Sequence, residues 1–171
     1  MAGQNSSFDE TRVTRSAEGT REIGAALGRL LSGGEVIVLT GPFGAGKTVF
    51  AQGIADGLGI DDHLTSPSFT LANSYPSEAG GPMIHHLDLW RVSSIQEALT
   101  FGLEEYFEDG AVTLIEWPGE LGTALGDEAI RVEMAIEEVD TRRIAISIPA
   151  AIDGVGERLR AASQSGSQIK S

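Results

Sequence analysis

The amino-acid sequence predicts a three-layer α/β/α fold with a mixed, mostly parallel central sheet and a C-terminal antiparallel hairpin. Three observations predict it. The nearly continuous apolar run at 35–40 is typical of a strand that is covered on both faces. A glycine-rich segment at 41–48 follows this run directly and leads into apolar residues at helical spacing. Two late segments, 130–136 and 143–148, alternate in the manner of antiparallel strands.

The first predicted element is a helix that Ser16 caps. Its apolar residues recur at three- and four-residue spacing up to the glycine pair at 33–34; they are Ile23, Ala26, Leu27, Leu30 and Leu31. One face of this helix is therefore expected to be buried. A second helix follows the glycine-rich segment, because Phe50, Ile54 and Leu58 keep the same spacing.

The middle of the chain predicts three further strands and one more helix. The strands are expected near 69–74, at 83–87 and at 112–115. Ser94 and Glu97 have the spacing of a capping box, which opens a helix that Gly102 interrupts. The late pair of strands is expected to turn at 140–141, and the sequence holds no internal repeat.

The length of 171 residues suits a single domain. We expect this domain at 11–150, between a flexible leader at 1–10 and an extension at 151–171 whose last part is disordered. The sequence has no secretion signal and no apolar stretch of about 18 residues, so we expect a cytoplasmic protein without a membrane partner. Cysteine is absent, which excludes disulfides, Cys-based metal sites and a thiol nucleophile.

The chain is strongly acidic, with a formal net charge of -13 from 25 Asp and Glu against 12 Lys and Arg. Such a charge opposes direct binding to DNA or tRNA, so any role on a nucleic acid is expected to go through a partner protein. A negative surface also keeps a protein dissolved, and this second explanation fits the composition equally well.

Residues 41–48 match the phosphate-loop pattern G-x-x-x-x-G-K-[ST]. Glycines suit such a loop because several backbone N–H groups must turn inward around an anion. The candidate phosphate ligands are Gly41, Gly44, Ala45 and Gly46. Lys47 would neutralise the β- and γ-phosphates, and the hydroxyl of Thr48 would bind a magnesium ion. The order of strand, loop and helix therefore predicts a fold like that of the P-loop nucleoside triphosphatases.

Two acidic residues, Asp88 and Glu116, end predicted strands on the side where α/β sheets bind ligands. One of them is expected to bind the magnesium ion together with Thr48. The other would hold a metal-bound water or orient the attacking water, and the two roles remain interchangeable at this point. A solvated or capping carboxylate is the alternative for either residue.

A hydroxyl-rich loop precedes the strand near 69–74, where nucleotide hydrolases often keep a segment that senses the γ-phosphate. Its hydroxyl residues are Thr65, Ser66, Ser68 and Thr70. An ordinary turn is the alternative.

Two pairs of residues are interpreted as structural. His85 and His86 are adjacent on a strand, so they point to opposite sides and do not resemble a metal pair. Trp90 and Trp117 are interpreted as packing residues, with a surface for a nucleotide or a partner as the second interpretation.

Two other classes of P-loop protein fit the sequence less well. A small-molecule kinase usually closes an arginine-rich lid over two phosphorylated ligands, and the sequence has no such cluster. Guanine-specific hydrolases read the base with Asn/Thr-Lys-x-Asp, yet the lysines are Lys47 and Lys170 alone. The sequence therefore argues against specificity for GTP.

Four motifs occur together in this chain: the phosphate loop, Thr65-Ser-Pro-Ser-Phe-Thr-Leu71, His86-Leu-Asp-Leu-Trp-Arg91 and Leu114-Ile-Glu-Trp-Pro118. Together these motifs resemble the TsaE family, also called YjeE. The likeness extends from residue 13 to residue 149. Trp90 stands where tyrosine is usual in the family, and Ser68 where threonine is common.

The resemblance implies an ATPase of the bacterial pathway that makes threonylcarbamoyladenosine in tRNA, acting with the TsaB and TsaD proteins. It implies phosphate contacts from the loop and Lys47, magnesium binding by Thr48 and Glu116, and an acidic role for Asp88. It also makes 65–70 a switch-like loop. Residues near the start of the first helix and a basic residue of the late hairpin would approach the nucleotide; the candidates are Glu18, Thr20 and either Arg142 or Arg143.

The expected function is therefore a magnesium-dependent ATPase with Lys47, Asp88 and Glu116 as catalytic residues. We expect it to be slow alone and dependent on partners, because the sequence offers neither a dedicated water-activating residue nor an arginine finger in an evident place. A nucleotide-gated binding module with incidental hydrolysis is the alternative interpretation, and a P-loop small-molecule kinase is the third.

Overall fold

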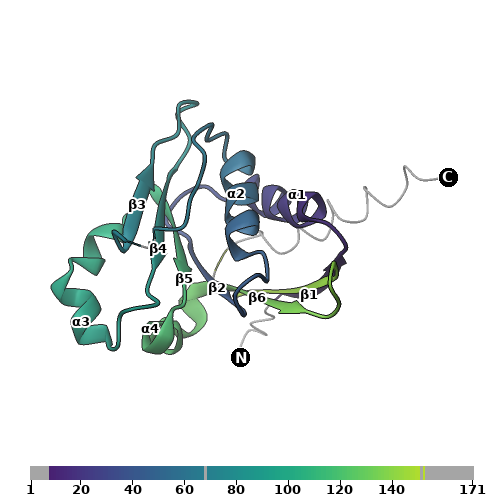
Figure 1. Ribbon diagram of the computed structural model, residues 1–171. Coiled ribbons are helices and arrows are strands. Elements are labelled where there is room, and N and C mark those ends of the chain that lie inside the picture. The colour runs from purple at the N-terminus through teal and green to yellow at the C-terminus, as the bar shows by residue number, and fades with distance from the viewer. Residues whose placement is uncertain (1–7, 68, 151, 153–171) are drawn as a thin grey trace, which may run out of the picture.

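The computed structural model describes residues 8–67, 69–150 and 152, which form a seven-stranded mixed sheet with helices on both faces (Figure 1). The strand order is β1-β7-β6-β2-β5-β4-β3. The strands are β1 (Phe8–Thr14), β2 (Val36–Thr40), β3 (Ala72–Tyr75), β4 (Met83–Asp88), β5 (Ala111–Glu116), β6 (Ala129–Ile136) and β7 (Arg142–Ile148). The predicted fold class, including the C-terminal antiparallel hairpin β6–β7, is confirmed.

Parallel pairing occupies the middle of the sheet. β2 pairs in parallel with β5 on one side and with β6 on the other, and β4 pairs in parallel with β5. The outer pairs are antiparallel. Every residue of β5 is buried, as expected for a strand covered on both faces. The carboxyl ends of β2, β4 and β5 therefore meet at one edge, where open α/β sheets bind their ligands.

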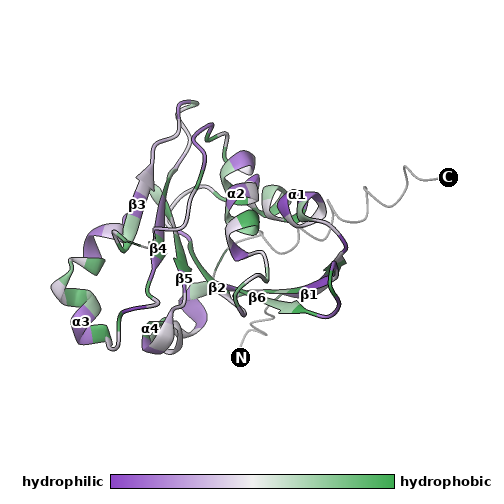
Figure 2. Cartoon of the chain, in the orientation of Figure 1, coloured by the Kyte–Doolittle hydropathy of each residue, from purple (hydrophilic) through white to green (hydrophobic). Residues whose placement is uncertain are grey.

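Helices form the two outer layers. They are α1 (Ala17–Gly28), α2 (Lys47–Gly57), α3 (Ile95–Thr100) and α4 (Gly119–Ala124), with the 3-10 turns η1 (Leu103–Tyr106) and η2 (Gly126–Glu128). α1 and α2 cover one face of the sheet, while α3, η1 and α4 pack on the other. Figure 2 shows that hydrophobic residues concentrate on the central strands between these layers.

Glycines fix the contact between α1 and α2. These residues are Gly24, Gly28, Gly53 and Gly57. A Cβ atom at Gly24 would collide with the carbonyl of Phe50, and one at Gly53 would collide with the carbonyl of Arg21. The two helix backbones therefore touch directly, and this contact fixes α2 and the loop before it.

The first strand corrects one prediction. The flexible leader predicted at 1–10 is wrong for residues 8–10, which belong to β1 and pair with β7. Phe8 anchors them, since it is only 8% exposed. Residues 1–7, 151 and 153–171 lie outside the described residues, so the rest of the leader and nearly all of the predicted extension stay predictions. Ile152, from that extension, packs against the core.

Three other details differ from the prediction. The first helix ends at Gly28 rather than at 33–34. The strand predicted near 69–74 begins at Ala72, because a turn in which Leu71 has a φ of 66° precedes it. Ser94 caps α3 as predicted, but the Glu97 carboxylate accepts hydrogen bonds from Ser93 instead of closing the capping box. None of the helices among the described residues is long and apolar enough to cross a membrane.

Candidate functional site

The phosphate loop joins the carboxyl end of β2 to the first turn of α2. Gly46 is the N-cap residue of α2 with a φ of 98°, and Gly44 has a φ of 76°, a region that favours glycine. Gly41 also has a positive φ, and a Cβ atom there would collide with the carbonyl of Met134 in β6. The backbone shape of the loop therefore depends on glycine at these positions, as the motif predicts.

Lys47 begins α2 and turns back over the loop. Its ammonium group donates hydrogen bonds to the carbonyls of Gly41 and Pro42, at 2.9 and 3.0 Å. The residue is 6% exposed. Burial lowers the pKa of Lys47, while the negative charges of Glu116 and Asp88 oppose that shift. The carbonyl contacts hold the charge at the mouth of the loop, where phosphate oxygens could take their place.

A cavity of about 450 Å³ lies beside the phosphate loop. It collects predicted residues that are far apart in the sequence. Its lining includes Lys47, Thr48, Ser66, Asp88 and Glu116. A cationic side chain, two hydroxyl groups and two carboxylates therefore face one space, at the edge of the sheet where the parallel strands end.

Asp88 and Glu116 lie opposite each other in the β4–β5 ladder, but their surroundings differ. Asp88 is half-buried and has a donor on each oxygen: Ser66 Oγ lies 2.9 Å from Oδ2, and the backbone N–H of Trp90 lies 3.1 Å from Oδ1. Glu116 is 3% exposed, and its Oε1 lies 2.9 Å from Nε2 of His86. The structure therefore distinguishes two carboxylates that the sequence left equivalent.

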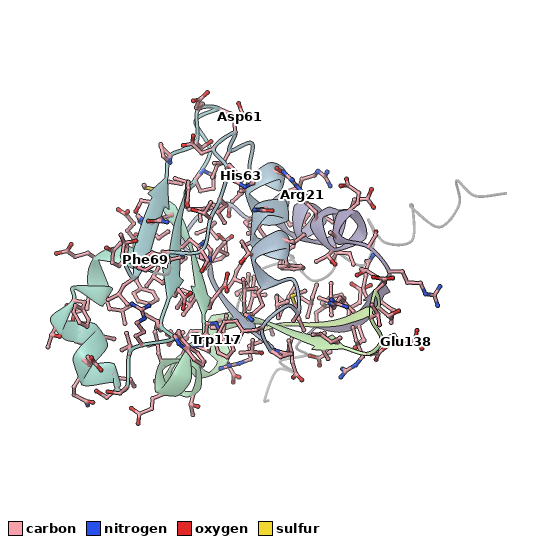
Figure 3. The ribbon with its side chains drawn as sticks, in the orientation of Figure 1. Arg21, Asp61, His63, Phe69, Trp117 and Glu138 are labelled. Atoms are coloured by element: carbon pink, nitrogen blue, oxygen red, sulfur yellow. The ribbon has the colours of Figure 1, made fainter. Side chains whose placement is uncertain are left out.

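Three aromatic rings form a cluster beside this cavity, and two of them, Phe43 and Trp117, line it. Phe43, Trp90 and Trp117 have ring centroids 4.7 to 5.1 Å apart. The Trp117 ring also lies 4.4 Å from the Lys47 ammonium, a cation–π distance, and the φ of Trp117 is 52° (Figure 3). Phe43 and Trp90 are 66% and 57% exposed. The tryptophans pack as predicted, but on other site residues rather than in the core. Phe43 was not singled out from the sequence.

A second cavity of about 280 Å³ lies on the other side of the loop and shares Gly44 and Gly46 with the first. The start of α1 and the β6–β7 turn close it, and its lining includes Ala45, Thr20 and Arg142. Sequence reasoning missed five other lining residues, which carry no motif of their own: Arg15, Ala17, Val49, Val139 and Asp140.

The structure separates the candidates that the family resemblance had proposed around this cavity. Arg142 donates hydrogen bonds to the carbonyl of Gly44, at 3.2 and 3.3 Å. Arg143 is not among the lining residues and pairs with Glu137 at 3.1 Å. Glu18 is exposed and does not line the cavity either. Thr20 and Arg142 are therefore brought to the loop, whereas Glu18 and Arg143 are not.

The hydroxyl-rich loop reaches the site through one residue. Ser66 lines the first cavity and bonds Asp88, whereas the backbone of Thr65 bonds the Tyr75 hydroxyl and Thr70 bonds Asn73. Ser68 lies outside the described residues. Phe69 is 90% exposed, and the Arg91 guanidinium lies 5.8 Å from its ring (Figure 3).

The adjacent histidines point to opposite faces of β4, as predicted. His85 bonds Ser74 through Nδ1 at 2.8 Å and Glu108 through Nε2 at 2.7 Å, on the face away from the phosphate loop. His86 bonds Glu116 on the phosphate-loop face.

A parallel strand, a glycine-rich loop and a helix that opens with lysine, beside two strand-end carboxylates, define the P-loop class of α/β proteins. Comparison with known proteins gives the particular family. Residues 14–144 match the family model described as "Threonylcarbamoyl adenosine biosynthesis protein TsaE". The chain belongs to the TsaE family, as its motifs suggested.

Individual relatives agree with this assignment. The chain is 35% identical to the tRNA threonylcarbamoyladenosine biosynthesis protein TsaE of Treponema pallidum over 135 residues, which cover 79% of this chain and 98% of the relative. It is 34% identical to the protein of the same name from Bacillus subtilis, over 77% of this chain and 80% of the relative. The crystal structure of Bacillus subtilis YdiB superposes with a TM-score of 0.73 at 26% identity, covering 94% of this chain and 99% of YdiB.

Proposed function

We propose that this chain is a cytoplasmic, magnesium-dependent ATPase that serves the threonylcarbamoyladenosine modification of tRNA together with the TsaB and TsaD proteins. The observation that carries the proposal is the convergence of Lys47, Thr48, Asp88 and Glu116 on one cavity beside the phosphate loop. Membership of the TsaE family, whose relatives are named for this biosynthesis, supports the pathway.

The loop would bind the triphosphate through backbone N–H groups and the positive end of α2. Lys47 would exchange its two carbonyl contacts for phosphate oxygens, which carry a full negative charge and bind an ammonium group more strongly. The adenosine part would extend into the second cavity, where Thr20 and Arg142 lie on the far side of Gly44 and Gly46.

The donor set of the first cavity fits magnesium, which prefers hard oxygen ligands in octahedral geometry. Thr48 and Glu116 would hold the ion, and Asp88, already fixed by Ser66 and Trp90, would orient a water molecule. Bound there, the ion would neutralise charge that develops on the phosphate oxygens. Within the described stretches, no group of three or more His, Asp or Glu residues could hold a metal ion. Nucleotide oxygens would supply further ligands.

Hydrolysis is expected to be slow without partners. Arginine does not occur among the residues that line the first cavity. In related hydrolases an arginine supplied by a second protein accelerates the reaction by about 10³ to 10⁵. The negative net charge of -13 also suits a protein that reaches tRNA through partners rather than directly.

Phosphate release from ATP tests the proposal, with the purified chain alone and with TsaB, TsaD and tRNA, and with Lys47→Ala as the blank. We expect a low rate that requires Lys47 and that the partners raise strongly. An absent or unstimulated rate, although ATP still binds, contradicts the ATPase.

A second candidate function is a nucleotide-gated binding module. The partly exposed aromatic cluster favours it. Phe43 lies in the phosphate loop, and Trp90 and Trp117 closely follow Asp88 and Glu116 in the chain. Nucleotide binding would then reshape a docking surface. Glu116→Gln separates the two functions, provided that the variant still binds ATP. Retained tRNA modification without hydrolysis favours the module, and loss of modification together with hydrolysis favours the ATPase.

A further inference from the structure

The buried residue His86 has one polar partner among the residues that the structure describes. Its side chain is fully buried in β4, and its Nε2 lies 2.9 Å from Oε1 of Glu116. The other ring nitrogen, Nδ1, is also buried and has no hydrogen-bond partner in the described part of the chain. Burying an imidazole is unfavourable when only one of its nitrogens has a hydrogen-bond partner. The arrangement therefore suggests a function for the contact with Glu116.

The chemistry of the two groups assigns the direction of this hydrogen bond. An ionised carboxylate only accepts hydrogen bonds, so Nε2 of His86 carries the hydrogen and donates it to Glu116. In the neutral ring Nδ1 then carries a lone pair.

The contact constrains the Glu116 carboxylate. Oε1 is held by His86, while Oε2 accepts no hydrogen bond from the described residues. Glu116 lines the same cavity as Lys47 and attracts its ammonium group. Without the bond from His86, this buried carboxylate would be stabilised most by turning toward the ammonium group of Lys47. There it would compete with a phosphate group for the positive charge.

We propose that His86 is a positioning residue: it holds Glu116 in the orientation that presents a free oxygen to the metal ion of the bound nucleotide. This inference rests on the proposed function, because it assigns a partner to the carboxylate that would bind magnesium. Outer partners of this kind orient the ligand and change metal affinity by about 10- to 100-fold when they are removed.

The neighbouring histidine supplies a matched control. His85 lies on the same strand and is also buried, at 5% exposure, but bonds Ser74 and Glu108 on the opposite face. A loss of metal affinity that came from disturbing β4 in general would appear in both His85→Leu and His86→Leu. A loss that came from Glu116 would appear in His86→Leu alone.

The test measures binding of Mn²⁺, as a spectroscopic substitute for Mg²⁺, to the ADP complex by electron paramagnetic resonance. ADP affinity is measured separately in EDTA, and circular dichroism verifies folding. We expect His86→Leu to raise the Kd for Mn²⁺ about tenfold while ADP affinity without metal changes less than about threefold. His86→Gln, whose amide N–H reaches as far as Nε2, should restore affinity to within about threefold of the unmodified chain.

A double-mutant cycle distinguishes positioning of Glu116 from a purely structural role of His86. In a Glu116→Gln background, His86→Leu should have little further effect on Mn²⁺ binding, because its route to the metal is gone. Unchanged Mn²⁺ affinity in folded His86→Leu, an equal loss in His85→Leu, or no rescue by His86→Gln would each overturn the positioning role. If the unmodified chain binds ADP but no Mn²⁺, the magnesium site of the proposed function fails as well.

Discussion

Arg142 of β7 donates two hydrogen bonds to the carbonyl of Gly44, 98 residues earlier in the chain, and so ties the C-terminal hairpin to the phosphate loop. Its neighbour Arg143 points to the other side of the strand and pairs with Glu137. Of these two adjacent residues, Arg142 therefore contacts the candidate site and Arg143 does not.

Arg142→Ala should weaken ATP binding about tenfold, because it removes a charged group from the second cavity and frees the Gly44 carbonyl. Arg143→Ala should stay within about twofold of the unmodified chain, since its exposed ion pair lies elsewhere. Titration calorimetry with a non-hydrolysable ATP analogue measures both. Equal losses in the two variants would contradict the assignment.

Ser66→Ala should lower hydrolysis about tenfold while changing the Kd for ATP less than about threefold, because Ser66 holds Oδ2 of Asp88. Thr70→Ala is the matched control from the same loop, since Thr70 bonds Asn73 away from the cavity. Single-turnover rates at saturating ATP give the comparison. A Ser66→Ala variant that binds ATP poorly but hydrolyses the bound ATP normally would assign the residue to binding instead.

Gly53→Ala should destabilise the fold by about 1–3 kcal/mol, because the new methyl group would collide with the carbonyl of Arg21 and force α1 and α2 apart. Gly110→Ala provides the comparison, because no atom lies within 4 Å of a Cβ atom built there. Urea denaturation measures the free energy of unfolding of both variants. An unchanged midpoint for Gly53→Ala would mean that the helices can separate at little cost.

The lowered pKa of Lys47 predicts a pH dependence of stability. Just below the ordinary value of 10.5, the unfolded chain keeps a proton that the folded chain has already released. The free energy of unfolding should therefore rise with pH across this window, relative to a Lys47→Met variant that lacks the group. Urea titrations between about pH 8 and pH 11 provide the measurement. Identical pH profiles for the two chains would show that burial does not shift this pKa.

Much of the fold and the centre of the site were predictable from the sequence. The phosphate loop is recognisable because an anion-binding backbone leaves few choices of residue, and the buried strands β2 and β5 are recognisable as apolar runs. Asp88 and Glu116 followed from the rule that ligands bind at the carboxyl ends of such strands.

Other features depend on contacts between distant segments. The sequence did not predict β1, because this strand lies at the edge of the sheet and has no apolar run. Four of the five residues between the buried Phe8 and Thr14 are charged or carry a hydroxyl group. The choice of Arg142 over Arg143 depends on the register of the hairpin. Phe43 occupies a variable position of the loop motif, and its aromatic partners, Trp90 and Trp117, lie on two other loops.

The most direct test of the central claim is a calorimetric titration of the chain with a non-hydrolysable ATP analogue and magnesium, run in parallel with Lys47→Ala. We expect one site per chain in the unmodified protein, weaker binding when EDTA replaces magnesium, and no measurable binding in a folded Lys47→Ala variant. Absence of binding to the unmodified chain, or equal binding to both chains, would contradict a nucleotide site at the phosphate loop.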